Sequence, residues 1–299
     1  MANYAYEIFD EVAKQKSFAR AAEVLMLTPS AISHSIAGLE DELGVPLFTR
    51  NKKGVSITGE GMLMLERVRE ILRNERLMRE EAAEIVGLNR GSVTIAGFSS
   101  VCSAWFPQII LNFQARYPGI EIDVLQGDYE DIYEWVSAGD ADLGIVSLRG
   151  SRDVREFPVH VDTFQCVTPK GTAPANGEFY TAKELESLPI IVTTRGYRTD
   201  QDRYFRENDI HLRPHFKFTD DSPIISFVEN GLGIFFLPDI ASERVDYDVD
   251  FFPLDPPFRR TIGIIMPKNV LPSPAARTLR KEIDDFLDTN HLRNVPNQN

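Results

Sequence analysis

The first 60 residues carry apolar side chains at the three- and four-residue steps of short helices. One such stripe predicts the first helix and consists of Ala5, Ile8, Phe9 and Val12. Ser17 is a good N-cap for a second helix over 18–25, whose alanines permit close helix approach. Thr28 is predicted to cap a third helix, which ends before Gly44.

The predicted third helix has two different faces. Pro29 stands at its first position, where a missing N–H costs nothing. Larger apolar residues share one face: Ile32, Ile36 and Leu39. Small or polar residues fall on the other: Ser30, Ser33, His34 and Ala37. The pattern therefore predicts a helix that is anchored by one face and presents the other to a partner.

A short two-stranded hairpin is predicted after the three helices. Strand patterns over 46–50 and 55–57 flank the polar turn 51–54. Three cations gather there: Arg50, Lys52 and Lys53. Three short helices followed by such a hairpin are typical of a winged helix-turn-helix, whose third helix enters the major groove of DNA. Small polar side chains allow the backbone of that helix to approach the base edges.

A long helix is predicted from the cap residue Thr58 to Ile85. Its apolar residues fall at alternating four- and three-residue steps, interrupted at Glu75, and are Met64, Val68, Ile71, Met78, Ala82 and Ile85. Such a seam suits coiled-coil-like pairing, and a two-fold operator requires a dimer. Segment 61–90 is therefore predicted to be a linker and dimerisation helix. The alternative is a surface helix that packs on its own domain.

From Ser92 onward, strand and helix patterns alternate. The predicted strands are 93–96, 120–125, 142–147, 164–167, 190–192, 215–218, 233–237 and 261–266. The predicted helices are 101–117, 129–138, 199–208, 223–230 and 274–287. This alternation predicts βαβ units on parallel sheets. The last helix is expected to return to the first of two lobes.

The fold class that follows is an N-terminal all-α winged helix-turn-helix with a long linker helix, and then a two-lobed α/β domain. The predicted boundaries are 1–60 for the first domain, 61–90 for the linker, 91–163 plus 267–299 for the first lobe, and 164–266 for the second.

Composition and charge change this picture only in part. With 43% hydrophobic and 26% charged residues, the chain is expected to be globular and soluble. A net charge of −13 argues against non-specific binding to nucleic acid. Residues 1–60 nevertheless hold six basic against eight acidic residues, so most of the excess acid lies beyond residue 90. A start without a signal pattern and the lack of an apolar run of about 18 residues predict a cytoplasmic protein.

The chain resembles the LysR-type transcriptional regulators. The specific matches are SFARAAEVL over 17–25, LTPSAISHSI over 27–36, Leu39-Glu40, Leu43-Gly44, Leu47-Phe48, Arg50 and TGEG over 58–61. Weaker matches are Phe113, Tyr117-Pro118, GDADLGI over 139–145, NGLG over 230–233 and Leu237-Pro238. The family pattern often has Gln and then Pro where this chain has Pro29 and Ser30, so bidentate reading of adenine by a Gln amide is not expected here.

The resemblance implies a winged helix-turn-helix, a dimerising linker helix and an effector-binding domain like a periplasmic binding protein. Its function would be sequence-specific DNA binding in transcription regulation, modulated by a small-molecule effector bound between two lobes. The partners would be operator DNA, the effector and further copies of the chain in a dimer or tetramer.

The candidate DNA-binding residues are Thr28, Pro29, Ser30, Ser33, His34, Arg50, Lys52 and Lys53. Serine hydroxyls donate or accept at base edges, and His34 can donate to a guanine acceptor or a phosphate. Lys52 and Lys53 are expected to reach phosphates or the minor groove. Thr28 has a purely structural alternative as a cap, and Arg50 has one as an ion-pair residue.

The candidate effector-binding residues lie in loops at the carboxyl ends of the predicted parallel strands: Ser99, Ser100, Ser147, Thr193, Thr194, Arg195, Asp220 and Asp221. Helix N-terminal N–H groups after Ser100, together with Arg195, favour a carboxylate ligand. Asp220 and Asp221 disfavour a strongly anionic one, so the expected effector is a carboxylate or a zwitterion. No cofactor and no metal site are expected.

Three alternatives compete with this interpretation. Cys102, beside the Ser99-Ser100 loop, suggests redox sensing, but both it and Cys166 fit the role of small buried apolar residues. A small-molecule-binding protein without gene control is disfavoured by the 90 residues before the α/β region. An enzyme is not expected: His160, His211 and His215 are available, but a nucleophile elbow, a phosphate loop and a metal-spaced His pair are all lacking.

Overall fold

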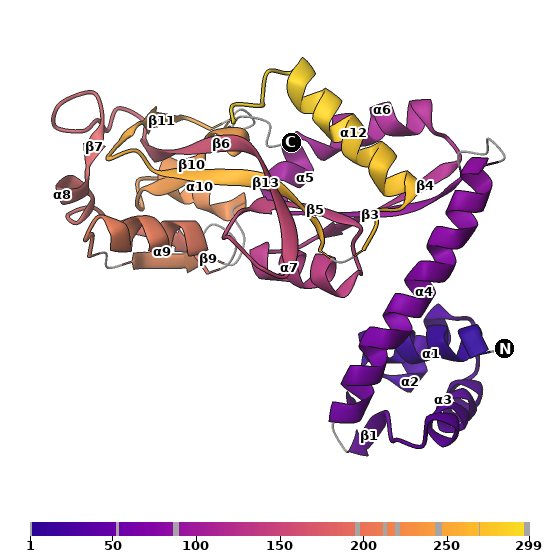
Figure 1. Ribbon diagram of the computed structural model, residues 1–299. Helices are drawn as coiled ribbons and strands as arrows, with labels where there is room; N and C mark the ends of the chain where they lie inside the picture. The colour runs from indigo at the N-terminus through magenta and orange to yellow at the C-terminus, as the bar shows by residue number, and fades with distance from the viewer. Residues whose placement is uncertain are drawn as a thin grey trace. The chain divides into compact units, whose positions relative to one another are not determined.

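The computed structural model describes residues 2–51, 54–85, 90–194, 198–211, 214–218, 222–242, 247–268 and 270–295 (Figure 1). The chain divides into two compact units, residues 1–88 and 89–299. None of the described helices is long and apolar enough to span a membrane.

The first unit has the predicted order of three helices, a hairpin and a long helix. Its elements are α1 (Ala2–Gln15), α2 (Phe18–Val24), α3 (Pro29–Leu43), β1 (Phe48–Asn51), β2 (Gly54–Ile57) and α4 (Gly59–Ile85). The predicted caps are present: Ser17 Oγ accepts from the backbone N–H of Arg20, and Thr28 Oγ1 accepts from that of Ala31. Gly44 ends α3 at φ 71°, a left-handed conformation that favours glycine.

One shared core holds this unit together. Its buried members are Ile8, Phe9, Val12, Ala21, Ala22, Ile32, Ile36, Leu39, Leu47, Leu65 and Val68. The ring of Phe48 on β1 makes edge contacts with Phe9 and Phe18, at centroid distances of 5.4 and 5.9 Å. The hairpin is thereby packed against α1 and α2.

The apolar seam of α4 is divided between two environments. Val68 is buried in the core of the first unit and Met64 packs against it, whereas Ile71, Met78 and Ile85 are exposed. Arg69 Nε donates to Asp10 Oδ1 at 2.8 Å and fixes this part of α4 to α1. The prediction of one continuous pairing seam is therefore wrong for the first half of the helix, which packs on its own domain.

The second unit is an α/β structure. Its strands are β3 (Gly91–Gly97), β4 (Ile120–Gln126), β5 (Leu143–Ser147), β6 (Val154–Pro169), β7 (Tyr180–Thr181), β8 (Ile190–Thr193), β9 (Pro214–Phe218), β10 (Phe235–Pro238), β11 (Val249–Phe252), β12 (Leu254–Asp255) and β13 (Arg259–Pro267). Its helices are α5 (Ser99–Ala104), α6 (Phe106–Arg116), α7 (Tyr129–Ala138), α8 (Ala182–Leu185), α9 (Arg198–Glu207), α10 (Ser222–Glu229), α11 (Asp239–Ser242) and α12 (Pro274–Thr289).

Two long strands run through the middle of the main sheet, whose order is β10-β6-β13-β5-β3-β4, with β11 also paired to β6. The strand pairs β3–β4, β3–β5 and β8–β9 are parallel, as predicted, but β6 pairs antiparallel with β13, β10 and β11. On one side of β6 and β13 lie β5, β3, β4 and α7, which we call the first lobe (Figure 1). On the other lie β10, β11, α9 and α10, which we call the second lobe.

Two sequence predictions for this unit need correction. The helix expected over 101–117 begins earlier, at Ser99, and is broken at Trp105 between α5 and α6, where Pro107 in the first turn of α6 supplies no N–H. The strand expected over 164–167 is the end of the much longer β6. Charged residues such as Asp162 at its buried positions hide the apolar alternation that signals a strand.

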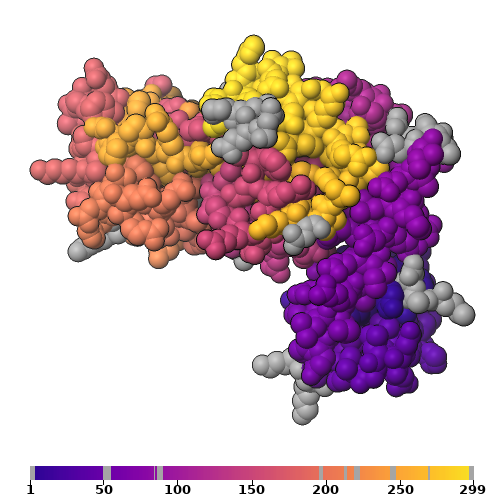
Figure 2. Space-filling model, in the orientation of Figure 1, coloured from indigo at the N-terminus to yellow at the C-terminus, as the bar shows by residue number. Residues whose placement is uncertain are grey.

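The final helix returns to the first lobe, as expected. It packs against β3 and α6, where Arg116 Nη1 lies 2.8 Å from Glu282 Oε2. In the space-filling view α12, coloured yellow, forms part of the visible surface of this unit (Figure 2). The chain therefore crosses between the lobes twice, through β6 and β13.

Candidate functional site

Helix α3 presents a small polar face. Ser30 and His34 are exposed and Ser33 is partly exposed, whereas Ile32 and Ile36 are buried beneath them. Pro29 is also exposed, at the first position of the helix. The predicted division of the helix into an anchoring face and a presented face is thus present in the structure.

The start of α3 joins a capping hydroxyl to an exposed candidate residue. Thr28 Oγ1 accepts from the backbone N–H of Ala31 at 3.2 Å and lies 3.0 Å from Ser30 Oγ. The structural role of Thr28 as an N-cap is therefore real, and its hydroxyl also orients that of Ser30. Both side chains are exposed, so the pair is accessible from outside the helix.

A carboxylate that sequence reasoning missed links the hairpin to α3. Glu40 Oε1 accepts from the backbone N–H groups of Leu47 and Phe48, at 2.7 and 3.1 Å. These bonds hold the start of β1 and the residue before it against the helix that carries the polar face. In the sequence, Glu40 stood out only as part of the match to the family pattern. That match did not indicate a role in holding the hairpin.

The cations of the hairpin are only partly placed. The backbone of Arg50 lies in β1 opposite Val55, and its side chain lies outside the described residues. Lys52 and Lys53 lie wholly outside them.

The effector candidates are separated by the structure into three groups. Ser100 and Ser147 are buried and belong to one polar network centred on Arg260. Ser99 and Thr194 are exposed, and neither has a described part in that network. Thr193 is buried, and its hydroxyl has no hydrogen-bond partner among the described residues. Three further candidates lie outside the described residues: Arg195, Asp220 and Asp221.

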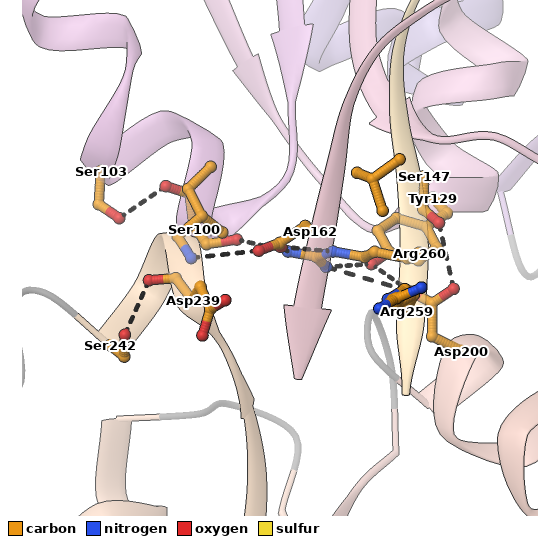
Figure 3. A network of polar contacts seen from close by, with 12 residues as sticks. Ser100, Ser103, Tyr129, Ser147, Asp162, Asp200, Asp239, Ser242, Arg259 and Arg260 are labelled. Atoms are coloured by element: carbon orange, nitrogen blue, oxygen red, sulfur yellow. Dashed lines mark hydrogen bonds and ion pairs between the residues drawn. The ribbon is translucent and has the colours of Figure 1, made fainter. Parts of the chain in front are cut away.

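An ion pair between β6 and β13 forms the centre of the network. Arg260 and Asp162 are register partners in the antiparallel ladder, and both side chains are fully buried. Arg260 Nε and Nη2 donate to Asp162 Oδ2 at 2.9 and 2.6 Å (Figure 3). The other carboxylate oxygen accepts from the backbone N–H of Ile240, at 3.3 Å.

The remaining donors of Arg260 reach the first lobe. Its Nη1 donates to Tyr129 Oη at 2.6 Å, and its Nη2 contacts Ser100 Oγ at 3.4 Å. The rings of Phe98 and Phe164 lie 4.7 and 5.1 Å from the guanidinium carbon, at cation–π distance. The cation is therefore enclosed by hydroxyls and aromatic faces.

A second carboxylate, Asp200 in the first turn of α9, joins this network from the second lobe. Tyr129 Oη donates to Asp200 Oδ2 at 2.8 Å, and Ser147 Oγ donates to Oδ1 at 3.1 Å. Arg203 Nη2, from the same helix, donates to Oδ1 at 3.1 Å. Figure 3 shows the side chains of Tyr129 and Asp200 pointing toward one another. One buried carboxylate thus connects α9 to α7 and β5.

Sequence reasoning found two serines of this network and missed its charged members, Asp162, Asp200 and Arg260, together with Tyr129. The usable signal was weak: a charged residue at an inward position beside an apolar strand run, as in Arg260 before 261–266. Charges are almost never fully buried unless they are paired. Which partner would pair with Arg260 was not visible in the local pattern.

The two cysteines do not have the properties of redox sensors. Burial raises the pKa of the Cys102 thiol to about 11, and that of the more deeply buried Cys166 is raised as well. Because the thiolate is the reactive form, neither thiol is expected to react readily near neutral pH. Among the described residues, no group of His, Cys, Asp or Glu is arranged to hold a metal ion.

Two protein-family models match the chain. The bacterial regulatory helix-turn-helix model of the lysR family matches residues 4–62, and the LysR substrate binding domain model matches residues 87–288. The second match alone covers more than half of the chain. The chain therefore belongs to the LysR family of transcriptional regulators, with a DNA-binding helix-turn-helix followed by an effector-binding domain.

Relatives and solved structures agree with this assignment. The chain is 28% identical over 264 residues to the uncharacterized HTH-type transcriptional regulator YvbU of Bacillus subtilis, covering 87% of this chain and 90% of that protein. It is 28% identical over 296 residues to the RuBisCO operon transcriptional regulator of Allochromatium vinosum, covering 96% of each.

Among solved structures, full-length OxyR from Pseudomonas aeruginosa has a TM-score of 0.72 at 20% identity, covering 98% of this chain and 96% of that one. Full-length CbnR in complex with its target DNA has a TM-score of 0.63 at 18% identity, covering 96% and 100%. At these identities the likeness shows the fold.

Proposed function

We propose that this chain reads a specific operator with α3 and the hairpin β1–β2. The observation that carries the proposal is the exposure of Ser30 and His34 on a helix whose opposite face is buried. Ser30, Ser33 and His34 then contact base edges, and Thr28 and Pro29 bring the start of the helix close to the backbone of the DNA. Arg50, Lys52 and Lys53 contact phosphates from the hairpin.

Two copies of the chain would occupy a two-fold operator. The exposed apolar residues from the middle of α4 to its end support pairing: Ile71, Met78 and Ile85. In this proposal the DNA-binding domain is residues 1–60, the linker is 61–90, the first lobe is 91–163 plus 267–299, and the second lobe is 164–266. The protein then acts in gene control in the cytoplasm and not in catalysis.

Footprinting with DNA from the region of its own gene tests this function. The expected result is a protected segment with two-fold symmetric half-sites, which shortens or disappears for the His34→Ala variant. The variant Glu42→Ala, at an exposed position near the end of the same helix, is the matched control and should protect the same segment. Absence of protection by the unmodified chain in moderate salt would contradict the proposal.

We further propose that a small polar effector binds between the lobes, where Ser100 and Ser147 lie in the buried network. A buried guanidinium surrounded by hydroxyl donors supports a ligand with a carboxylate group, including a zwitterion. Screening the full chain against a metabolite panel by thermal shift tests this, because a ligand that binds the folded state raises the melting midpoint.

A further inference from the structure

The environment of Asp200 resembles that of a bound anion. Its carboxylate comes from α9 in the second lobe, but two of its hydrogen-bond donors belong to the first lobe: Tyr129 at the start of α7 and Ser147 at the end of β5. Arg260 Nη1 stands 4.0 Å from Asp200 Oδ2. Hydroxyl donors and a nearby cation, all buried, form the kind of site that holds a carboxylate.

The proton positions in this site follow from the donors. Arg260 can only donate, so its bond to Tyr129 Oη occupies an acceptor position of the phenol. The phenolic hydrogen is then directed at Asp200 Oδ2. Asp162 already accepts two bonds from Arg260. Asp200 is therefore the second carboxylate of the network and is held mainly by hydroxyl groups and by Arg203.

Two buried polar side chains of the second lobe, in α9 and β8, lack partners among the described residues. Gln201, the next residue of α9, is wholly buried, and neither its Oε1 nor its Nε2 has a hydrogen-bond partner among the described residues. Thr193 Oγ1, at the end of the preceding strand β8, is in the same condition within the described part of the chain. Buried amide and hydroxyl groups are normally satisfied, so the Gln201 amide, one residue after Asp200 in α9, and the Thr193 hydroxyl are candidate partners for a ligand of this lobe.

We infer that Tyr129, Ser147 and Arg260 form an anion site that Asp200 of the same chain occupies in this structure. A carboxylate-bearing effector acts by replacing Asp200 there, and Gln201 and Thr193 bind its other polar atoms. This inference rests on the proposed effector role of the second unit and names the ligand class and the group it displaces. Displacement of the Asp200 carboxylate by the effector detaches α9 from α7 and β5, which changes how the lobes are joined.

The covalent attachment of Asp200 to the chain makes the site selective for a suitable ligand. Because Asp200 is part of the chain, its carboxylate has a high effective concentration at the donors, and a free anion must compete with it. A simple carboxylate is then a weak competitor in the unmodified protein. Removal of the Asp200 carboxylate should make the same donors available to it.

Acetate is the probe that tests this in the full-length chain. The variant Asp200→Ala should lower the melting midpoint by about 6 °C or more, because it leaves buried donors unpaired. Acetate should restore at least about half of that loss in a saturable manner, whereas acetamide, its neutral isostere, should not. The added substitution Tyr129→Phe should abolish the rescue.

The matched control is Asp202→Ala, which removes an exposed carboxylate of the same helix that pairs with Arg198. Acetate should affect its midpoint no more than that of the unmodified chain. Equal acetate effects on all three proteins, or no acetate effect on Asp200→Ala, would overturn the inference.

A second measurement covers the case in which Asp200→Ala does not fold. Asp200→Asn keeps the size of the side chain but removes its charge, so acetate should slow amide hydrogen exchange over 129–138 at lower concentrations in this variant than in the unmodified chain. Equal concentrations would count against the site. None of these readouts involves DNA or the physiological effector, so a chain that binds an operator but shows no rescue refutes only this inference.

Discussion

Arg260 and Asp162 face each other directly across the β13–β6 ladder, and their fully buried side chains share two hydrogen bonds to one carboxylate oxygen. Opposite residues of an antiparallel pair lie on the same face of the sheet, within contact distance. Since β6 and β13 are the strands that run through both lobes, this pair stands where the two crossings meet. We therefore expect both the stability and the lobe geometry of the second unit to depend on it.

Replacing one partner of this ion pair should lower the free energy of unfolding more than replacing both partners. Arg260→Met leaves an uncompensated buried carboxylate and should lower the free energy of unfolding by about 3–5 kcal/mol. The double variant Arg260→Met with Asp162→Leu should recover part of that loss, because no isolated charge remains buried. Denaturant unfolding measures both. Arg259→Met, at an exposed neighbouring position, should change stability little; a comparable loss there would show that the effect is not specific to the buried pair.

The polar face of α3 should control operator affinity without supporting the fold. Ser30→Ala and His34→Ala are each expected to weaken specific binding by about 1–3 kcal/mol, because each removes a base-edge or phosphate contact from an exposed side chain. Gel shifts with an operator fragment give the affinity, and melting curves check the fold. An unchanged affinity for both variants would place the reading residues elsewhere.

The hairpin lysines should determine the salt dependence. Lys52→Ala and Lys53→Ala should each reduce the slope of log K against log salt by about 0.9 for every phosphate that the variant no longer binds. They should weaken binding to all DNA sequences about equally. Titrations at several salt concentrations provide the measurement, with Lys170→Ala, an exposed lysine of the second unit, as the control. Identical slopes in all variants would exclude phosphate binding by these residues.

We expect Glu40 to affect both the stability of the first unit and its affinity for DNA. Glu40→Ala leaves the N–H groups of Leu47 and Phe48 without their acceptor, and a loss of about 1–3 kcal/mol in unfolding free energy is expected. Glu40→Gln keeps a carbonyl acceptor and should retain most of the stability. Operator affinity should follow the same order, since a displaced hairpin misplaces its cations. Full affinity in a destabilised Glu40→Ala protein would show that the two functions are independent.

The Cys102 thiol should react slowly near neutral pH. Burial raises its pKa to about 11, so the native thiolate fraction rises only as the pH approaches that value. The raised pKa also contributes stability that is fully present below the pKa of the unfolded thiol and is lost as the pH rises through the folded value. The rate of iodoacetamide labelling against pH, with unfolded protein as the reference, tests this. Fast labelling of the native chain at pH 7 would restore the redox alternative.

The elements of the first unit were readable from local sequence. Caps such as Ser17 and Thr28, the Gly44 stop and the spacing of Ile32, Ile36 and Leu39 act within a few residues, so their physical effects are visible in the chain itself. The same holds for the parallel strands with continuous apolar runs, such as β5 and β8. The division of the α4 seam was not readable, because it depends on which surface α1 presents to that helix.

Local pattern by itself determined most of the longer helices, most of the strands, the polar face of α3 and two serines of the buried network. Only the tertiary structure decided the rest of that network, because Tyr129, Asp162, Asp200 and Arg260 are far apart along the chain and each alone resembles an ordinary surface polar residue. Their burial is tolerable only when they meet one another, since a charge without a partner is expelled to water. Pairing across β6 and β13 and the approach of α9 bring them together.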